Sequence, residues 1–228
     1  MGWHCIARLV AVGLAGSMAG GAQAAAPAPG PASAPAVTPA GTDKVVLVVG
    51  DSLSAEYGLA TGTGWVNLLG QRMAQQHYRY RAVNASISGD TTSGGRSRLP
   101  ALLKQWHPAI VILELGGNDA LRGTPLATSR ANLDAMAAAS TAAGAKVVVA
   151  GIQVPPNYGR QYTQDFAAMF ADTARTAHAP LVPFVLKGIA DRPDADDWFQ
   201  ADRIHPVAKA HPIILENIWP AVQPLLRK

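Results

Sequence analysis

Residues 45–53 read VVLVVGDSL, and this stretch decides the fold. The five apolar residues 45–49 leave no face for solvent, which is typical of a central strand in a parallel sheet covered on both sides. Gly50 allows a sharp turn where the strand ends. Ser52 therefore follows the carboxyl end of a strand, where open α/β sheets bind their ligands, and it is a candidate nucleophile.

Four further apolar stretches alternate with segments that carry apolar residues at helical spacing. They are residues 78–83, 109–115, 146–150 and 181–185. The alternation predicts a three-layer α/β/α fold around a five-stranded parallel sheet in the flavodoxin-like order. The first of the four alternates in polarity, so we expect it near the edge of the sheet.

Helix boundaries follow from caps and prolines. Thr91 or Thr92 is expected to cap a helix, and Pro100 is expected to split that helix in two. Pro206 is expected to begin the closing helix, over residues 206–226.

The N-terminal residues 1–24 resemble a secretory signal. Their apolar run is shorter than the roughly 20 residues that span a bilayer, and Ala22-Gln23-Ala24 forms a small-x-small cleavage site. A buried or anchoring helix is the alternative, which several glycines disfavour. We expect cleavage after Ala24, a periplasmic or secreted product, a disordered Ala/Pro-rich linker over residues 25–41 and one folded domain over 42–228.

Composition excludes several classes of protein. The net charge of +4 comes without a basic run, and aromatic residues make up 6% of the chain, so nucleic-acid binding has little support. The mild positive charge is compatible with transient contact with anionic lipid. Cys5 is the only cysteine and lies in the leader, which leaves no thiolate for catalysis or metal binding. No nucleotide-binding glycine motif follows a strand, and we expect no cofactor.

Polar residues follow three of the predicted strands: Ser52, Gly89 and Asn118. Because the carboxyl ends of parallel strands share one edge of the sheet, these residues are expected to converge. Asp202 and His205 lie three apart in the loop before the last helix, so the carboxylate can hold the proton of one ring nitrogen. The other ring nitrogen can then accept the serine proton.

This constellation predicts acyl transfer to Ser52, with the backbone N–H groups of Ser52 and Gly89 and the amide of Asn118 stabilising the oxyanion. A side chain at position 89 would obstruct a substrate that approaches the N–H. A metal site made from Asp202, His205 and His211 is the alternative, but its spacing fits no standard motif. His211 has no acid nearby in the sequence and is expected to be structural.

The same residues resemble a known family. Residues 50–53 resemble the GDSL block, and Gly89, residues 116–119 and Asp202-x-x-His205 resemble the other three blocks of the SGNH/GDSL hydrolases, in the same order. Residues 84–91, 113–123 and 155–159 resemble the periplasmic thioesterase I/lysophospholipase L1 (arylesterase) subgroup. The resemblance extends from about residue 44 to the C-terminus.

The resemblance implies a Ser52–His205–Asp202 triad and an oxyanion hole formed by Ser52, Gly89 and Asn118. It implies a shallow site for acyl thioesters, aryl esters and lysophospholipids, with a loop over residues 153–162 that moves over the acyl chain. Asp51 and Tyr158 are the further candidates for substrate binding, and a structural role for Asp51 in binding loop amides is the alternative. We expect a monomer. Two other readings are a carbohydrate O-acetyl esterase and a non-catalytic lipid-binding protein.

Overall fold

The structure is a computed structural model that describes residues 43–228. The predicted signal over 1–24, its cleavage site, Cys5 and the linker over 25–41 lie outside the described residues. None of the helices within 43–228 combines the length and apolar character needed to cross a bilayer.

Five parallel strands form one sheet in the order β2-β1-β3-β4-β5, which confirms the predicted flavodoxin-like arrangement. The strands are β1 (Lys44–Gly50), β2 (Tyr80–Asn84), β3 (Ile110–Glu114), β4 (Lys146–Ala150) and β5 (Leu181–Val182). The alternating strand β2 lies at the edge, as predicted. The last strand is shorter than the predicted 181–185, because Pro183 has no N–H with which to continue the ladder.

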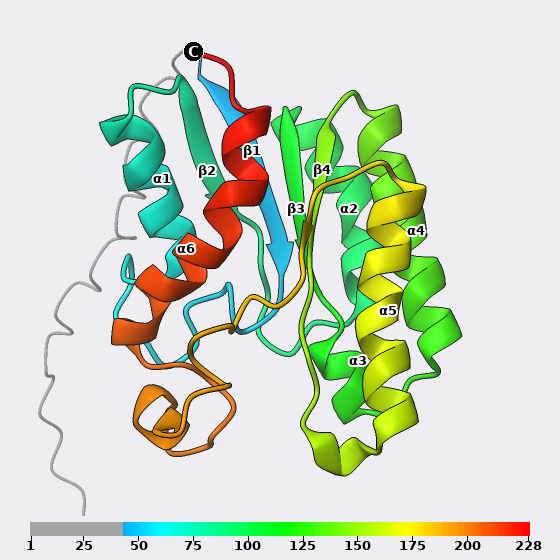
Figure 1. The fold of residues 1–228 in the computed structure, drawn as a ribbon. Coiled ribbons are helices and arrows are strands. Elements are labelled where there is room, and N and C mark those ends of the chain that lie inside the picture. The colour runs from blue at the N-terminus through cyan, green and yellow to red at the C-terminus, as the bar shows by residue number, and fades with distance from the viewer. Residues whose placement is uncertain (1–42) are drawn as a thin grey trace, which may run out of the picture. The chain divides into compact units, whose positions relative to one another are not determined.

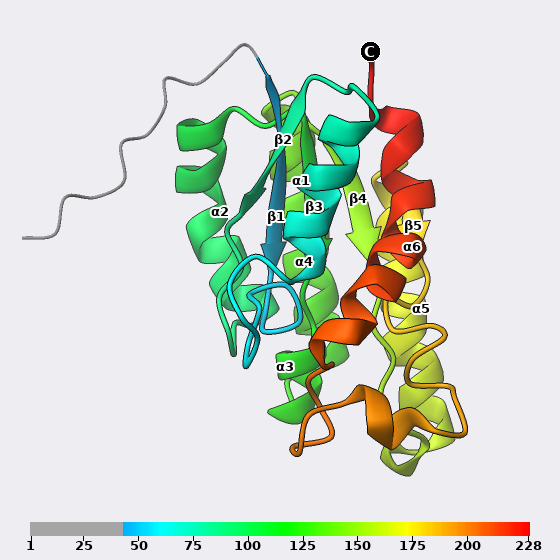
Figure 2. The same cartoon turned by 90° about the vertical axis from the view of Figure 1, so that its left-hand side faces the viewer.

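Helices cover both faces of the sheet (Figures 1 and 2). They are α1 (Trp65–Gln75), α2 (Thr92–Trp106), α3 (Gly117–Leu121), α4 (Leu126–Ala142), α5 (Arg160–Thr176) and α6 (His211–Val222). Short 3-10 helices occupy Pro156–Tyr158, Ala195–Trp198, Ala208–Ala210 and Gln223–Leu225. Helix α1 packs against α6 on one face, while α2, α4 and α5 pack side by side on the other, which gives the expected three layers.

Helix α2 confirms one prediction and contradicts another. The side chain of Thr91 caps the helix by accepting a hydrogen bond from the N–H of Gly94. The helix then runs through Pro100 without a break, so the predicted split is wrong. Pro100 is exposed and has no N–H to donate within the helix, but the residues on both sides of it remain helical.

The closing helix begins later than predicted. Helix α6 starts at His211, with Pro212 in its first turn. A proline does lie at the start of the closing helix, but it is Pro212 and not the predicted Pro206. Pro206 instead pairs with Phe199 in an isolated antiparallel bridge. The segment that carries His205 is therefore a braced loop and not a helix start.

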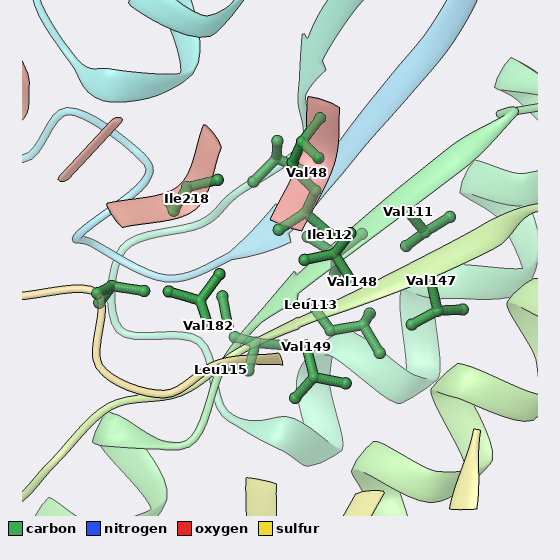
Figure 3. Close-up of a cluster of buried hydrophobic side chains, with 14 of the residues drawn as sticks. Val48, Val111, Ile112, Leu113, Leu115, Val147, Val148, Val149, Val182 and Ile218 are labelled. Carbon is green, nitrogen blue, oxygen red and sulfur yellow. The ribbon is translucent and has the colours of Figure 1, made fainter. Parts of the chain in front are cut away.

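The core consists mostly of valine, leucine and isoleucine from the central strands. Val48, Ile112 and Val148 are neighbours in register on β1, β3 and β4, and all three are buried (Figure 3). Burial of each such side chain contributes roughly 1.5–3 kcal/mol to stability. Since consecutive residues of β1 are buried, both faces of the strand are packed, and this fixes the point at which Ser52 emerges.

Candidate active site

The Ser52 hydroxyl lies just beyond β1, within hydrogen-bond distance of an imidazole 153 residues further along the chain. His205 Nε2 is 2.8 Å from Ser52 Oγ, and His205 Nδ1 is 2.7 Å from Asp202 Oδ2. The structure therefore brings together the three residues that the sequence placed in a triad. The order of contacts, acid to imidazole to hydroxyl, is the one that serine activation requires.

Asp202 is held by its own turn. Its Oδ1 accepts hydrogen bonds from the N–H groups of Ile204, at 2.9 Å, and His205, at 3.0 Å. The hydrogen bond from the His205 side chain, followed by these backbone bonds, lowers the pKa of Asp202 to about 2. An ionised carboxylate at this position keeps a proton on Nδ1 of His205, which leaves Nε2 to accept the proton of Ser52.

A second set of contacts braces the histidine loop against the serine loop. The N–H of Gln200 donates to the carbonyl of His205 at 2.7 Å, and its side-chain amide donates to the carbonyls of Tyr57 and Pro206. The ring of Tyr57 lies 4.3 Å from the imidazole of His205, centroid to centroid. Sequence reasoning missed both Gln200 and Tyr57. A Cβ at Gly58 would lie 2.1 Å from Gln200 Oε1. This glycine is therefore the one sign in the sequence that another segment packs closely against the serine loop.

The predicted oxyanion donors are available. Within residues 43–228, the N–H groups of Ser52 and Gly89 donate no hydrogen bond. Asn118 gives one amide hydrogen to Asp51 Oδ2 at 3.0 Å and retains a second. Gly89 has φ +79°, and a Cβ there would meet only Arg122, at 3.7 Å. Position 89 therefore requires a glycine because its backbone is left-handed, and not because neighbouring atoms of residues 43–228 crowd it.

Asp51 acts on Asn118 from beneath the site. It is 2% exposed, and its two carboxylate oxygens accept from the N–H of Leu53 and from the Asn118 amide. Burial raises the pKa of Asp51 to about 6, while the bonds from Leu53 and Asn118 act in the opposite direction. Because both oxygens already have partners, these contacts support the structural alternative for Asp51. They orient the Asn118 amide.

A second buried carboxyl, missed by sequence reasoning, lies behind Asp51. Glu114 ends β3, and its Oε2 accepts from Ser54 Oγ at 2.6 Å and from the Asp51 N–H at 3.4 Å. Burial, with the nearby Asp51 charge, raises the pKa of Glu114 well above its ordinary value and so favours the neutral form of this carboxyl. A Cβ on Gly50 would lie 2.7 Å from Glu114 Oε2, which explains the glycine before Asp51.

A cavity of about 440 Å³ adjoins the serine. Asp51, Ser52, Asn118 and His205 line one part of it, so the predicted substrate contact Asp51 borders the cavity, and Gly89 does not belong to the lining. The apolar part is formed by Leu121, Ile152, Val154, Pro155, Tyr158, Phe184, Leu186, Phe199 and Ile204. Tyr158, a predicted substrate contact, thus lies at the cavity with the loop that was expected to cover an acyl chain. Such a lining suits an alkyl or aryl group next to a carbonyl carbon.

His211 has the structural role that the sequence suggested. It is buried, and its Nδ1 accepts a hydrogen bond from the N–H of Trp65 at 3.1 Å. Burial lowers the pKa of His211, which keeps the ring neutral and able to accept. Across residues 43–228, no group of three or more His, Cys, Asp or Glu side chains is arranged to hold a metal ion.

Known proteins resemble this chain in sequence. Residues 48–213 match the model of the GDSL-like Lipase/Acylhydrolase family. The esterase TesA of Pseudomonas aeruginosa is 51% identical over 183 residues, which cover 80% of this chain and 90% of that protein. The thioesterase 1/protease 1/lysophospholipase L1 of Escherichia coli K12 is 39% identical over 181 residues, with 79% and 84% covered.

A solved structure gives the same result for the fold. The crystal structure of TesA superimposes with a TM-score of 0.77 at 51% sequence identity, covering 80% of this chain and 100% of that one. The fold described above therefore has an experimental counterpart at 51% sequence identity.

Proposed function

Because this chain belongs to the GDSL-like lipase/acylhydrolase family and is an ester hydrolase, we propose that it cleaves carboxylic esters and thioesters through an acyl-Ser52 intermediate. The observation that carries the proposal is the chain of contacts from Asp202 through His205 to Ser52, at 2.7 and 2.8 Å, beside an apolar cavity. Ser52 is the nucleophile, His205 the base and Asp202 the orienting acid.

The geometry fits a two-step reaction. Ser52 Oγ attacks the carbonyl carbon while His205 Nε2 takes its proton, and ionised Asp202 stabilises the imidazolium. Negative charge on the former carbonyl oxygen is met by the N–H groups of Ser52 and Gly89 and by the second amide hydrogen of Asn118. His205 then protonates the departing alkoxide or thiolate as the carbon–oxygen or carbon–sulfur bond breaks. Water, activated by His205, releases the acid from Ser52.

The cavity favours substrates with an apolar acyl or aryl group. We propose aryl esters, acyl-CoA thioesters and lysophospholipids as substrates, and the name of the Escherichia coli relative includes both thioesterase and lysophospholipase. Each methylene that moves from water into the cavity is worth about 0.8 kcal/mol. A carbohydrate O-acetyl esterase would gain nothing from this lining, so we place that reading second.

The rim of the site supports transient contact with lipid. Within residues 43–228, the large hydrophobic side chains that are exposed are Tyr57, Ile87, Leu121, Tyr158 and Ile204. All five lie on segments beyond the carboxyl ends of the strands, which is the edge that carries Ser52. Leu121, Tyr158 and Ile204 also line the cavity, and exposed apolar side chains that adjoin one another are typical of surfaces that contact other molecules. Binding of the protein to anionic vesicles would measure this contact.

The remaining parts of the proposal concern the whole chain. Residues 1–24 direct export to the periplasm or the medium and are removed after Ala24. Residues 25–41 form a linker to the hydrolase domain, which spans 42–228 and works as a monomer without a cofactor.

The nucleophile is tested by Ser52→Ala. We expect p-nitrophenyl butyrate hydrolysis to fall by at least about 10³-fold while the melting temperature stays unchanged, since loss of a triad nucleophile removes the covalent path. Ser97→Ala, an exposed serine of α2, is the matched control and should keep full activity. An alkyl phosphonate should label Ser52 alone, as read by mass spectrometry. Retained turnover in Ser52→Ala would refute the proposal.

A further inference from the structure

The guanidinium of Arg98, on helix α2, joins three segments beside the proposed site. Its Nε donates to Asp90 Oδ2 at 2.7 Å, Nη1 donates to the carbonyl of Ala85, and Nη2 donates to the carbonyl of Gly50 at 3.3 Å. The side chains of Arg98 and Asp90 are 19% and 11% exposed, so this ion pair is largely shielded from solvent. Charge-assisted bonds in such a setting are strong and directional.

The three acceptors are placed around the Gly89 turn. Gly50 ends β1 two residues before Ser52, while Ala85 and Asp90 lie on either side of Gly89. Arg122 also holds the turn, because its Nη2 donates to the carbonyl of Gly89 at 2.9 Å. The N–H of Ile87 donates to the carbonyl of Gly50 at 3.1 Å, and the N–H of Asp90 closes the turn onto the Ile87 carbonyl.

A glycine in α2 gives independent evidence for the importance of the Asp90 position. A Cβ on Gly94 would lie 1.8 Å from Asp90 Oδ1. Glycine in a helix is less favourable than alanine because of its backbone freedom. Helix α2 carries a glycine where the carboxylate of Asp90 lies against it, so a side chain at position 94 would displace that carboxylate.

We propose that Arg98 is a positioning residue that sets the place of the Gly89 N–H relative to Ser52 by clamping residues 85–90 to the end of β1. The inference rests on the proposed role of Gly89 in the oxyanion hole. The planar fork of arginine reaches three acceptors in fixed directions, which the single ammonium of lysine cannot reproduce. Donors held in advance stabilise the developing oxyanion without having to reorganise.

Arg130 provides a matched control within the same molecule. It bonds the carboxylates of Asp134 and Asp172 at 2.9 Å, which links α4 to α5, and its side chain is 30% exposed. It bonds none of the residues of the proposed site. Loss of Arg130 should therefore affect stability as loss of Arg98 does, without reaching the Gly89 turn.

The test compares Arg98→Ala with Arg130→Ala for kcat and KM on a p-nitrophenyl ester, for melting temperature and for the rate of phosphonate labelling. A misplacement of about 1 Å can cost about 10²-fold in rate, so Arg98→Ala should lower kcat and the labelling rate by about 10- to 100-fold. KM should change little, because the substrate in its ground state is bound mainly by the apolar cavity, which Arg98 does not line. Arg98→Lys should recover only part of the loss. Equal kcat in Arg98→Ala and Arg130→Ala would overturn the inference.

Gly94→Ala keeps the test decisive if Arg98→Ala does not fold. The new methyl group displaces Asp90 from the other side, while the better helix former should hold the melting temperature within about 3 °C. We expect kcat to fall about 10-fold, and wild-type kcat would count against the clamp. An inactive Ser52→Ala with wild-type kcat in both clamp variants would remove this inference alone. An active Ser52→Ala would remove the proposed function, and this inference with it.

Discussion

The nucleophile and the base of the proposed site are positioned by different means. Ser52 follows a strand that is buried on both faces, and the groups around it are buried too, including Asp51 and Glu114. His205 lies in a loop that also carries the acid Asp202, and the side chain of Asp202 is 37% exposed. This loop is held by the bridge between Phe199 and Pro206, by hydrogen bonds from Gln200 and by one ring contact with Tyr57.

The difference teaches which changes separate activity from stability. On the serine side, the same buried groups place the nucleophile and fill the interior, so a substitution there affects both properties. On the histidine side, the contacts are largely exposed and contribute little to folding, since exposed pairs are worth about 1 kcal/mol or less. Substitutions there should change the rate and leave the fold.

The largest expected effect is on the histidine side. In Asp202→Asn, the amide oxygen can still accept from the N–H groups of Ile204 and His205, so the turn should survive. The amide NH₂ then faces His205 Nδ1 and forces the ring proton onto Nε2, which can no longer accept from Ser52. We expect kcat to fall by about 10⁴-fold at unchanged melting temperature.

The control for this variant is Asp194→Asn, which loses an exposed ion pair with Arg192 in the same segment. It should retain activity. A loss of kcat of less than 10-fold in Asp202→Asn would contradict the proposed role. So would a loss of kcat that is explained by a lower melting temperature, since the variant would then simply be less folded.

The next effect is on the serine side and concerns stability. The pKa of Glu114 is raised above its ordinary value of 4.5, so above that pH the folded state binds a proton that the unfolded state has lost. The stabilisation that Glu114 contributes is therefore fully present below pH 4.5. It is lost as the pH rises through the folded pKa, by at most about 1.4 kcal/mol per pH unit. Glu114→Gln keeps an acceptor for Ser54 and should flatten this slope.

Urea unfolding between pH 5 and 8 measures the effect, with Glu216→Gln, an exposed partner of Arg72, as the control. The histidine side has the opposite sign. The pKa of Asp202 is lowered to about 2, so its contribution is lost as the pH falls through the window between its ordinary value of 3.8 and about 2. Parallel pH slopes in wild type and Glu114→Gln would show that this carboxyl does not titrate with folding.

Much of the fold could be predicted because it depends on local patterns. The apolar run 45–49 identified a central strand, and the alternation of strands and helices implied the parallel sheet. The errors at Pro100 and Pro206 have one cause: proline limits its own segment, but burial and partners elsewhere decide whether a helix continues or begins.

The site could be predicted only in part, for a physical reason. Ser52, Asn118 and His205 follow strands or precede the last helix, so topology places them at one edge. Arg98 and Glu114 act through side-chain contacts between segments far apart in the chain, and such contacts leave no periodic pattern. Their indirect traces in the sequence are glycines: Gly50 lies against Glu114, and Gly94 lies against Asp90, the ion-pair partner of Arg98.

The smallest effect that we predict tests how far the position of His205 depends on the ring of Tyr57. Tyr57 is exposed and covers the imidazole of His205 at 4.3 Å, and an aromatic pair of this kind is worth roughly 0.5–1.5 kcal/mol. Tyr57→Ala should therefore lower kcat by about 2- to 10-fold without a change in melting temperature, because His205 loses a contact that limits its motion. Tyr57→Phe keeps the ring and should recover most of the rate. If Tyr57→Ala lowered the melting temperature by several degrees, the histidine loop would belong to the folded core, and the contrast between the two sides would fail.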